Sequence, residues 1–133
     1  MLGQKISETK GKRTARRIVS VDPPTAEVSF EDVGTMLGIA TVGSGTYSSV
    51  MRPDGSLFGT GQGMNLATDS ADVVMWEGSG TGKLGPGGSA SYRGMLFFRT
   101  TGEKFSSLNN GCGAFEYEVD AAGNTTSTVW EWK

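Results

Sequence analysis

The stretch "WEGSGTGKLG" (residues 76–85) is the part of the sequence closest to a phosphate-binding loop. Such a loop needs Gly, four residues, then Gly-Lys and Ser or Thr, so that backbone N–H groups wrap the phosphates and a hydroxyl reaches magnesium. Here only three residues separate Gly78 from Gly82, and Leu84 follows Lys83. Because Leu84 has no oxygen to offer a metal, the stretch argues against nucleotide binding, and its glycines need an architectural explanation.

Glu77, in the same stretch, is the acid with the clearest chemical interest. If its strand face points inward, it is flanked by Met64 and Leu96, with Gln62 and Tyr92 next in line. A carboxylate among apolar side chains is suited to take or give a proton near neutral pH. The alternative is a register that differs by one residue, since such a slip moves every side chain to the other face and puts Glu77 in solvent.

Several kinds of chemistry are excluded by the residues that the chain lacks. There is no histidine, which removes Ser-His-Asp and Cys-His activation of a nucleophile. Without a Cys/His cluster, neither a metal site nor a cofactor is predicted. The lone Cys112 cannot form an internal disulfide and is expected to pack as a small apolar residue in a reducing cytoplasm. The sequence leaves open whether the protein is an enzyme.

The elements that must position these residues read as strands. No window repeats apolar residues with a helical period, whereas eight segments combine β-branched, aromatic and small residues. The turn sequences "RPDGS", "TDSAD", "GPGG" and "DAAGN" separate most of them. This pattern predicts one all-β domain over residues 1–133, either an up-and-down antiparallel barrel or a sandwich. The expected strands are 14–22, 26–34, 40–51, 56–68, 72–84, 89–101, 113–120 and 124–133.

The glycines fall into register across two of these hairpins. Counting outward from "TDSAD" pairs Gly59, Gly61 and Gly63 with Gly82, Gly80 and Gly78, all on one face. Counting from "RPDGS" puts Tyr47 opposite Gly61, with Gly55 in a left-handed turn position. A face without side chains relieves crowding where a closing sheet bends. We therefore expect the opposite face to point inward.

That inward face predicts a small-molecule pocket with apolar walls and a few polar anchors. In the segment "SSLNNGCG", the two asparagines either form a turn or close the mouth of a barrel and donate to a ligand. Glu77 is the candidate proton-transfer residue. The expected ligand-facing residues are Gln62, Met64, Leu66, Met75, Tyr92, Leu96, Phe98, Asn109 and Asn110.

Charge and hydropathy bear on partners and location. Up to Arg17 the chain carries six basic residues against Glu8, although the net charge is −2. Because no aromatic residues are interleaved there to stack on bases, a solvated edge strand is favoured over nucleic-acid binding. No apolar run approaches the ~20 residues of a membrane span, and no signal-peptide stretch is present, which predicts a cytoplasmic protein. Trp130 and Trp132 share one strand face that suits either a homo-oligomer contact or the core.

The second half of the chain resembles small uncharacterised bacterial proteins with an allene-oxide-cyclase-like, calycin-type β-barrel. The likeness extends from about Ser29 onward and is strongest at "SLNN", "FEYEVDAAGN" and "WEWK". It implies a closed antiparallel barrel of about eight strands, mostly connected by hairpins and shaped like a lipocalin, with an interior able to take a hydrophobic ligand. No cyclase catalytic motif is found, so the resemblance carries over no catalytic residue.

Three functions fit these observations. The favoured one is a barrel that binds a small hydrophobic or amphipathic molecule in its interior. The second is a cofactor-independent cyclase or isomerase in which Glu77 moves a proton. The third is a protein-interaction module whose barrel is filled by its own side chains.

Overall fold

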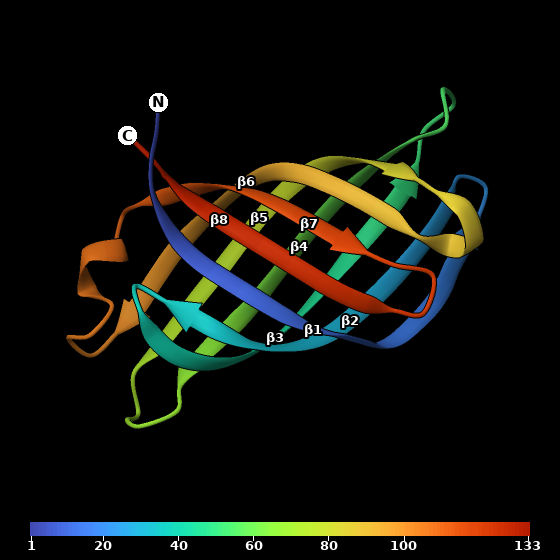
Figure 1. Cartoon of the computed structure of the whole chain (residues 1–133). Helices are drawn as coiled ribbons and strands as arrows, with labels where there is room; N and C mark the ends of the chain where they lie inside the picture. Colours follow the sequence, from blue (N-terminus) through green and yellow to red (C-terminus); the bar gives the residue numbers. More distant parts are fainter.

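Eight antiparallel strands follow one another along the chain, and each pairs with the next (Figure 1). In this computed structural model, which describes residues 1–133, the last strand also pairs with the first, so the sheet closes into a barrel. The predicted eight-strand antiparallel barrel is thus confirmed. The strands are β1 (Leu2–Val21), β2 (Pro24–Met36), β3 (Ile39–Met51), β4 (Ser56–Ala67), β5 (Val73–Leu84), β6 (Ala90–Thr101), β7 (Cys112–Val119) and β8 (Asn124–Trp132).

Strand β1 differs most from the sequence expectation. It begins at Leu2, well before the predicted start at residue 14, and it pairs with both β2 and β8. Up to Lys12 the basic residues therefore lie between two hydrogen-bonded neighbours, and the predicted edge strand is wrong there because the barrel closes through β8. From Arg13 to Val21 the strand pairs with β2 alone.

The turns follow the chemistry expected from their residues. The Arg52 backbone N–H donates to the Ser56 carbonyl at 2.8 Å, and Gly55 has φ 86°, the left-handed value predicted for it. At the β7–β8 turn, the Asp120 carboxylate accepts hydrogen bonds from the backbone N–H groups of Ala122 and Asn124, each at 2.9 Å. Such local side-chain caps fix tight hairpins.

Helical structure is limited to two short 3₁₀ turns, η1 (Pro86–Gly88) and η2 (Ser106–Leu108). η2 belongs to the segment between β6 and β7 that covers one end of the barrel (Figure 1). No helix in the structure has the length and apolar character needed to cross a membrane.

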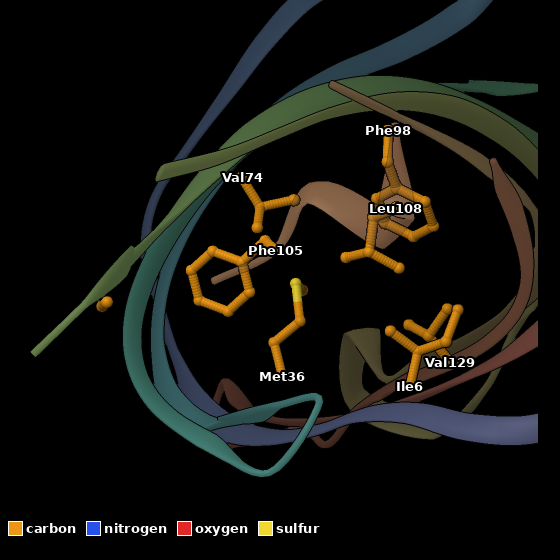
Figure 2. Packing of buried hydrophobic residues seen from close by; sticks show 8 residues of the cluster. Ile6, Met36, Val74, Phe98, Phe105, Leu108 and Val129 are labelled. Carbon is orange, nitrogen blue, oxygen red and sulfur yellow. The ribbon is translucent and has the colours of Figure 1, made fainter. Parts of the chain in front are cut away.

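Two apolar clusters fill the two ends of the barrel. Figure 2 shows the first, in which Phe105 and Leu108 from the η2 segment meet side chains from several strands. The second lies at the other end and is built around Tyr92 and Tyr117. Trp76 and Phe115 pack against both clusters and connect them. The first cluster is Ile6, Met36, Ala67, Val74, Phe98, Phe105, Leu108 and Val129, and the second is Phe30, Leu57, Tyr92, Tyr117 and Val119.

The glycine face of β4 and β5 is the one that points into the barrel. Aromatic rings from other strands lie directly over this bare backbone. A Cβ atom added at Gly61 would lie 2.7 Å from the Cβ of Tyr47, and one added at Gly82 would lie 2.6 Å from the Tyr92 ring. The Tyr47–Gly61 pairing predicted from the sequence is confirmed. The glycines of the phosphate-loop-like stretch thus belong to strand β5, where they make room for interior rings.

Candidate functional site

A cavity of about 90 Å³ lies in the barrel interior between the two apolar clusters. One wall is the glycine backbone of β4 and β5, represented by Gly59, Gly61, Gly78 and Gly80. The remaining lining combines aromatic rings with a small number of polar side chains, which is the usual composition of a small-molecule site. The lining rings are Phe30, Tyr47, Trp76, Tyr92, Phe98, Phe115 and Tyr117, and the lining polar residues include Ser7, Thr9, Asp32, Asn65 and Ser127.

Asp32 on β2 is the only carboxylate among the lining residues, and no Lys or Arg is among them. Its Oδ1 atom is buried and has no hydrogen-bond partner. Burial raises the pKa of Asp32, and the nearby Thr9 side chain opposes part of this shift. The site therefore contains one acid whose ionised form is disfavoured by its surroundings and whose acceptor oxygen is free.

Gly43 allows Asp32 to meet a second polar side chain. In the sheet, Gly43 on β3 pairs with Asp32 on one side and with Asn65 on β4 on the other. A Cβ atom at Gly43 would overlap Asp32 Oδ1 and would lie 2.6 Å from Asn65 Nδ2. The two side chains thus converge over a bare stretch of backbone, and Asn65 is only 5% exposed. A carboxyl group and an amide group are held side by side on the cavity wall.

Three tyrosines line the end of the cavity closed by the second cluster, and Tyr117 is the one that lies near Asp32. The ring centroids of Tyr47 lie 5.6 Å from Tyr92 and 5.8 Å from Tyr117. The Tyr92 hydroxyl shares a hydrogen bond of 2.7 Å with the Ser49 hydroxyl. By contrast, the buried Tyr117 hydroxyl has no partner that meets hydrogen-bond geometry.

The tyrosine hydroxyls keep their protons at neutral pH. Burial raises the pKa of Tyr47 to about 12. Burial also raises the pKa of Tyr117, and the neighbouring Tyr47 and Asp32 add to that shift. A protonated Tyr117 hydroxyl is both a donor and an acceptor, and the Tyr47 hydroxyl is its neighbour, so the wall presents one unpartnered acceptor at Asp32 and one hydroxyl at Tyr117. This pair can orient a small polar group.

The structure corrects the strand face chosen from the sequence for β4 and β5. Glu77 is exposed on the outer face and does not line the interior cavity. Gln62 is paired with Glu77 on that same outer face. The neighbouring pair, Gly61 and Gly78, lines the interior cavity. Met64 and Leu66 are 45% and 41% exposed, and Met75 is paired with Met64. The expected inward face is wrong because the interior rings need the glycine face beneath them.

Tyr92, Leu96 and Phe98 do line the cavity. Placing them on the same face as Glu77 requires a two-residue turn at "GPGG". The turn instead has three residues, with Gly85 N–H donating to the Ser89 carbonyl at 2.7 Å. This one-residue change reverses the faces of β6 relative to β5. At "TDSAD" the observed pairing of Gly59 with Gly80 differs from the expected one by two residues, so no face changes there.

Asn109 and Asn110 serve the η2 segment. The Asn109 side-chain oxygen accepts a hydrogen bond of 2.8 Å from the Thr100 backbone N–H. Asn110 has φ 61°, the left-handed conformation expected of a turn residue. Both are exposed. The segment does close one barrel mouth, but it does so with Phe105 and Leu108.

Outside the barrel, apolar side chains remain uncovered on the faces of β4 to β6 and on β8. Phe97 is 55% exposed and Trp132 is 51% exposed, whereas Trp130 is half-buried. The homo-oligomer contact expected at the tryptophans stays a prediction.

Asp32, Asn65 and Tyr117 were not singled out from the sequence. Asp32 occurs in "SFEDVG", where period-two alternation places it on the same face as Val28 and Phe30. An acid on the same predicted strand face as two apolar residues is the sequence signal that could have identified Asp32. No gathering of three or more His, Cys, Asp or Glu side chains with metal-binding geometry is found.

Comparisons with known proteins show the same fold in two bacterial proteins. The chain is similar to a conserved protein of unknown function from Rhodopseudomonas palustris, with a TM-score of 0.77 and 11% identity over 98% of this chain and 97% of that one. It is also similar to a protein with unknown function from Clostridium acetobutylicum ATCC 824, with a TM-score of 0.78 and 12% identity over 98% of each chain. No protein-family model and no curated protein matches the sequence. At these identities the likeness shows the fold alone.

Proposed function

We propose that the barrel binds one small amphipathic molecule in its interior cavity. Its polar group would meet Asp32, Asn65 and Tyr117, and its apolar part would lie between the rings and the glycine wall. The observation that carries this proposal is the pair of buried, unpartnered oxygens, Asp32 Oδ1 and Tyr117 Oη. A buried polar atom left without a partner costs about 1–3 kcal/mol, and a ligand that supplies the missing hydrogen bonds recovers that free energy.

The cavity volume limits the size of this ligand. An apolar cavity of ~150 Å³ holds one benzene molecule. The 90 Å³ observed here suits a molecule, or a part of one, with only a few heavy atoms. Long fatty acids and isoprenoids, which the resemblance to allene-oxide-cyclase-like barrels would suggest, do not fit this volume. The resemblance supports only the presence of a binding site in the barrel interior.

The two alternative functions have less support. An isomerase that uses Glu77 requires this carboxylate to reach the interior, and it lies on the outer surface. A filled barrel requires an interior without space, whereas a cavity lies between the two clusters.

A titration followed by NMR tests the proposal. Amide signals of Gly59, Gly61, Gly78 and Gly80 are recorded while small alcohols, amides, amines and carboxylates are added to the ¹⁵N-labelled protein. We expect at least one compound to shift these signals in a saturable manner. Decanoate, included as a size control, should not do so.

A matched pair of variants locates the binding. Gly59→Ala adds a methyl group to the cavity wall. The new Cβ atom would lie 3.5 Å from the Tyr92 ring, which is an ordinary van der Waals contact. Removing space for one methyl group should weaken binding about tenfold. Thr60→Ser changes the outer face of the same strand and should leave the affinity unchanged. The proposal fails if no compound shifts the glycine signals, or if both variants bind like the unmodified protein.

A further inference from the structure

We propose that the ligand of this cavity is a small organic cation, such as a primary or methylated ammonium ion. This inference rests on the proposed function and narrows its ligand class. It follows from the charge of the lining, from the rings and from the positions of the arginines nearest the cavity.

The cavity lining contains one acidic side chain and no basic one. Asp32 is the only Asp, Glu, Lys or Arg among the lining residues. Its Oδ1 atom has no hydrogen-bond donor from the protein. An ionised carboxylate accepts hydrogen bonds only, so it complements a group that carries donors and a positive charge. A bound cation would also favour the ionised form of Asp32 against the effect of burial.

The rings supply the second element of cation recognition. Phe30 lies with its ring centroid 6.3 Å from Trp76 and 5.4 Å from Tyr117, and these rings line the same cavity as Asp32. The π-face of Trp, Tyr or Phe attracts ammonium groups, and the attraction is stronger when the cation is desolvated. Neutral tyrosine hydroxyls add acceptors without adding charge.

No arginine supplies a competing anion site inside the cavity. Arg13 and Arg16 act on Tyr47 through their charges, but neither lines the cavity. Their guanidinium groups reach the hairpin turns at the barrel end, close to Gly123 and Gly88 respectively. An anionic ligand inside the cavity would instead face Asp32 without a basic side chain beside it.

A cation and a neutral molecule of equal size, together with a larger anion, separate charge from shape. Isopropylamine, isopropanol and isobutyrate are titrated at pH 7 into the labelled protein, with the Gly61 and Gly78 amides as the readout. We expect the dissociation constant of the amine, a cation at this pH, to be at least tenfold lower than that of the alcohol. Isobutyrate should show no saturable shift of these amides.

Two isosteric variants assign the preference to the interior acid. Asp32→Asn should remove the advantage of the amine over the alcohol. Glu77→Gln removes the same charge from the outer face and should preserve that advantage. If Asp32→Asn does not fold, the ligand series on the unmodified protein still decides the question.

The outcomes separate this inference from the proposed function. If isopropanol or isobutyrate binds the cavity as tightly as the amine, or if Asp32→Asn keeps the preference, the cation inference is overturned and interior binding stands. If none of the three shifts the glycine amides, while other small probes do, the cation inference again fails alone. If no probe of any kind shifts them, both proposals fall.

Discussion

Some strands place large side chains in the middle of this barrel, whereas β4 and β5 present bare glycine backbone there. β4 and β5 each have glycine at three inward positions, and rings from β3, β5, β6 and β7 occupy the space above them. At most of these glycines, a Cβ atom would collide with a ring or with a neighbouring carbonyl. The glycines are therefore not equivalent, and their differences can be measured.

Gly59 and Gly78 should respond in opposite directions to the same substitution. A Cβ at Gly59 meets only ordinary contacts, so Gly59→Ala should raise the free energy of unfolding by about 0.4–1 kcal/mol through lost freedom of the unfolded chain. A Cβ at Gly78 would overlap the Met95 carbonyl oxygen, so Gly78→Ala should lower it by about 1–3 kcal/mol. Urea denaturation measures both. Equal effects would show that the inward face is not crowded as described.

Asp32 should make stability depend on pH in a defined direction. Because burial raises its pKa in the folded state, the folded protein holds this proton more tightly than the unfolded chain does. The Asp32 contribution is therefore greatest below its ordinary pKa of 3.8 and is lost as pH rises through the folded value. Asp32→Asn should thus gain stability relative to the unmodified protein on going from pH 4 to pH 8.

Urea midpoints at the two pH values, with Glu77→Gln as an exposed control, give the difference directly. A gap between Asp32→Asn and the unmodified protein that does not change with pH would mean that Asp32 is not desolvated.

At the scale of elements, the η2 segment seals one end of the barrel. Phe105 is fully buried in the first cluster, as Figure 2 shows. Phe105→Ala should cost about 3–5 kcal/mol, since it leaves a cavity in packed apolar surroundings. Phe97→Ala removes the same ring from an exposed site and should change stability by less than ~0.5 kcal/mol. Thermal or urea unfolding compares the two, and similar losses would contradict the cap.

The strands could be predicted from this sequence. Which face of each strand points into the barrel could not be predicted in every case. Turn residues and β-branched runs placed the ends of β3 to β8 within a residue or two of the observed bounds. The face of β6 depended on whether the turn after Gly85 had two residues or three, and Pro86-Gly87-Gly88 permits both. Here Gly87 and Gly88 both have positive φ, which allows the three-residue form.

The site itself was harder to predict than the strands. The composition of Glu77, Met64 and Met75 resembles a pocket wall. The inward face was decided instead by aromatic rings of other residues, which pack against the glycines of β4 and β5. This packing includes pairs far apart in the chain, such as Gly80 with Phe115, which only the folded sheet brings together.

At the scale of the whole molecule, closure joins the two ends of the chain. Strands β1 and β8 lie side by side, with both termini at the same end of the barrel (Figure 1). The Lys133 backbone N–H donates to the Met1 carbonyl at 2.8 Å, and the Met1 amino group donates to the Lys133 carbonyl at 2.8 Å. Long β1, with two partners, is thus the strand that completes the barrel.

A circular permutant should therefore fold. We would join the termini by a short Gly-Ser linker and open the chain between Ser70 and Ala71, in the exposed turn after β4. The permutant should keep the β-sheet circular dichroism spectrum, with Tm lowered by less than about 10 °C. An unfolded permutant would contradict adjacent termini.

The orientation of the strands decides the position of the ligand, and intermolecular NOEs test it most directly. The methyl groups of Leu96, inside the cavity, and of Met64 and Met75, on the outer surface, are labelled with ¹³C, and a saturating small probe is added. We expect NOEs from the probe to Leu96 and to the Trp76 indole, with none to the two methionines. NOEs to Met64 and Met75 without any to Leu96 would place binding on the outer face and contradict the interior site.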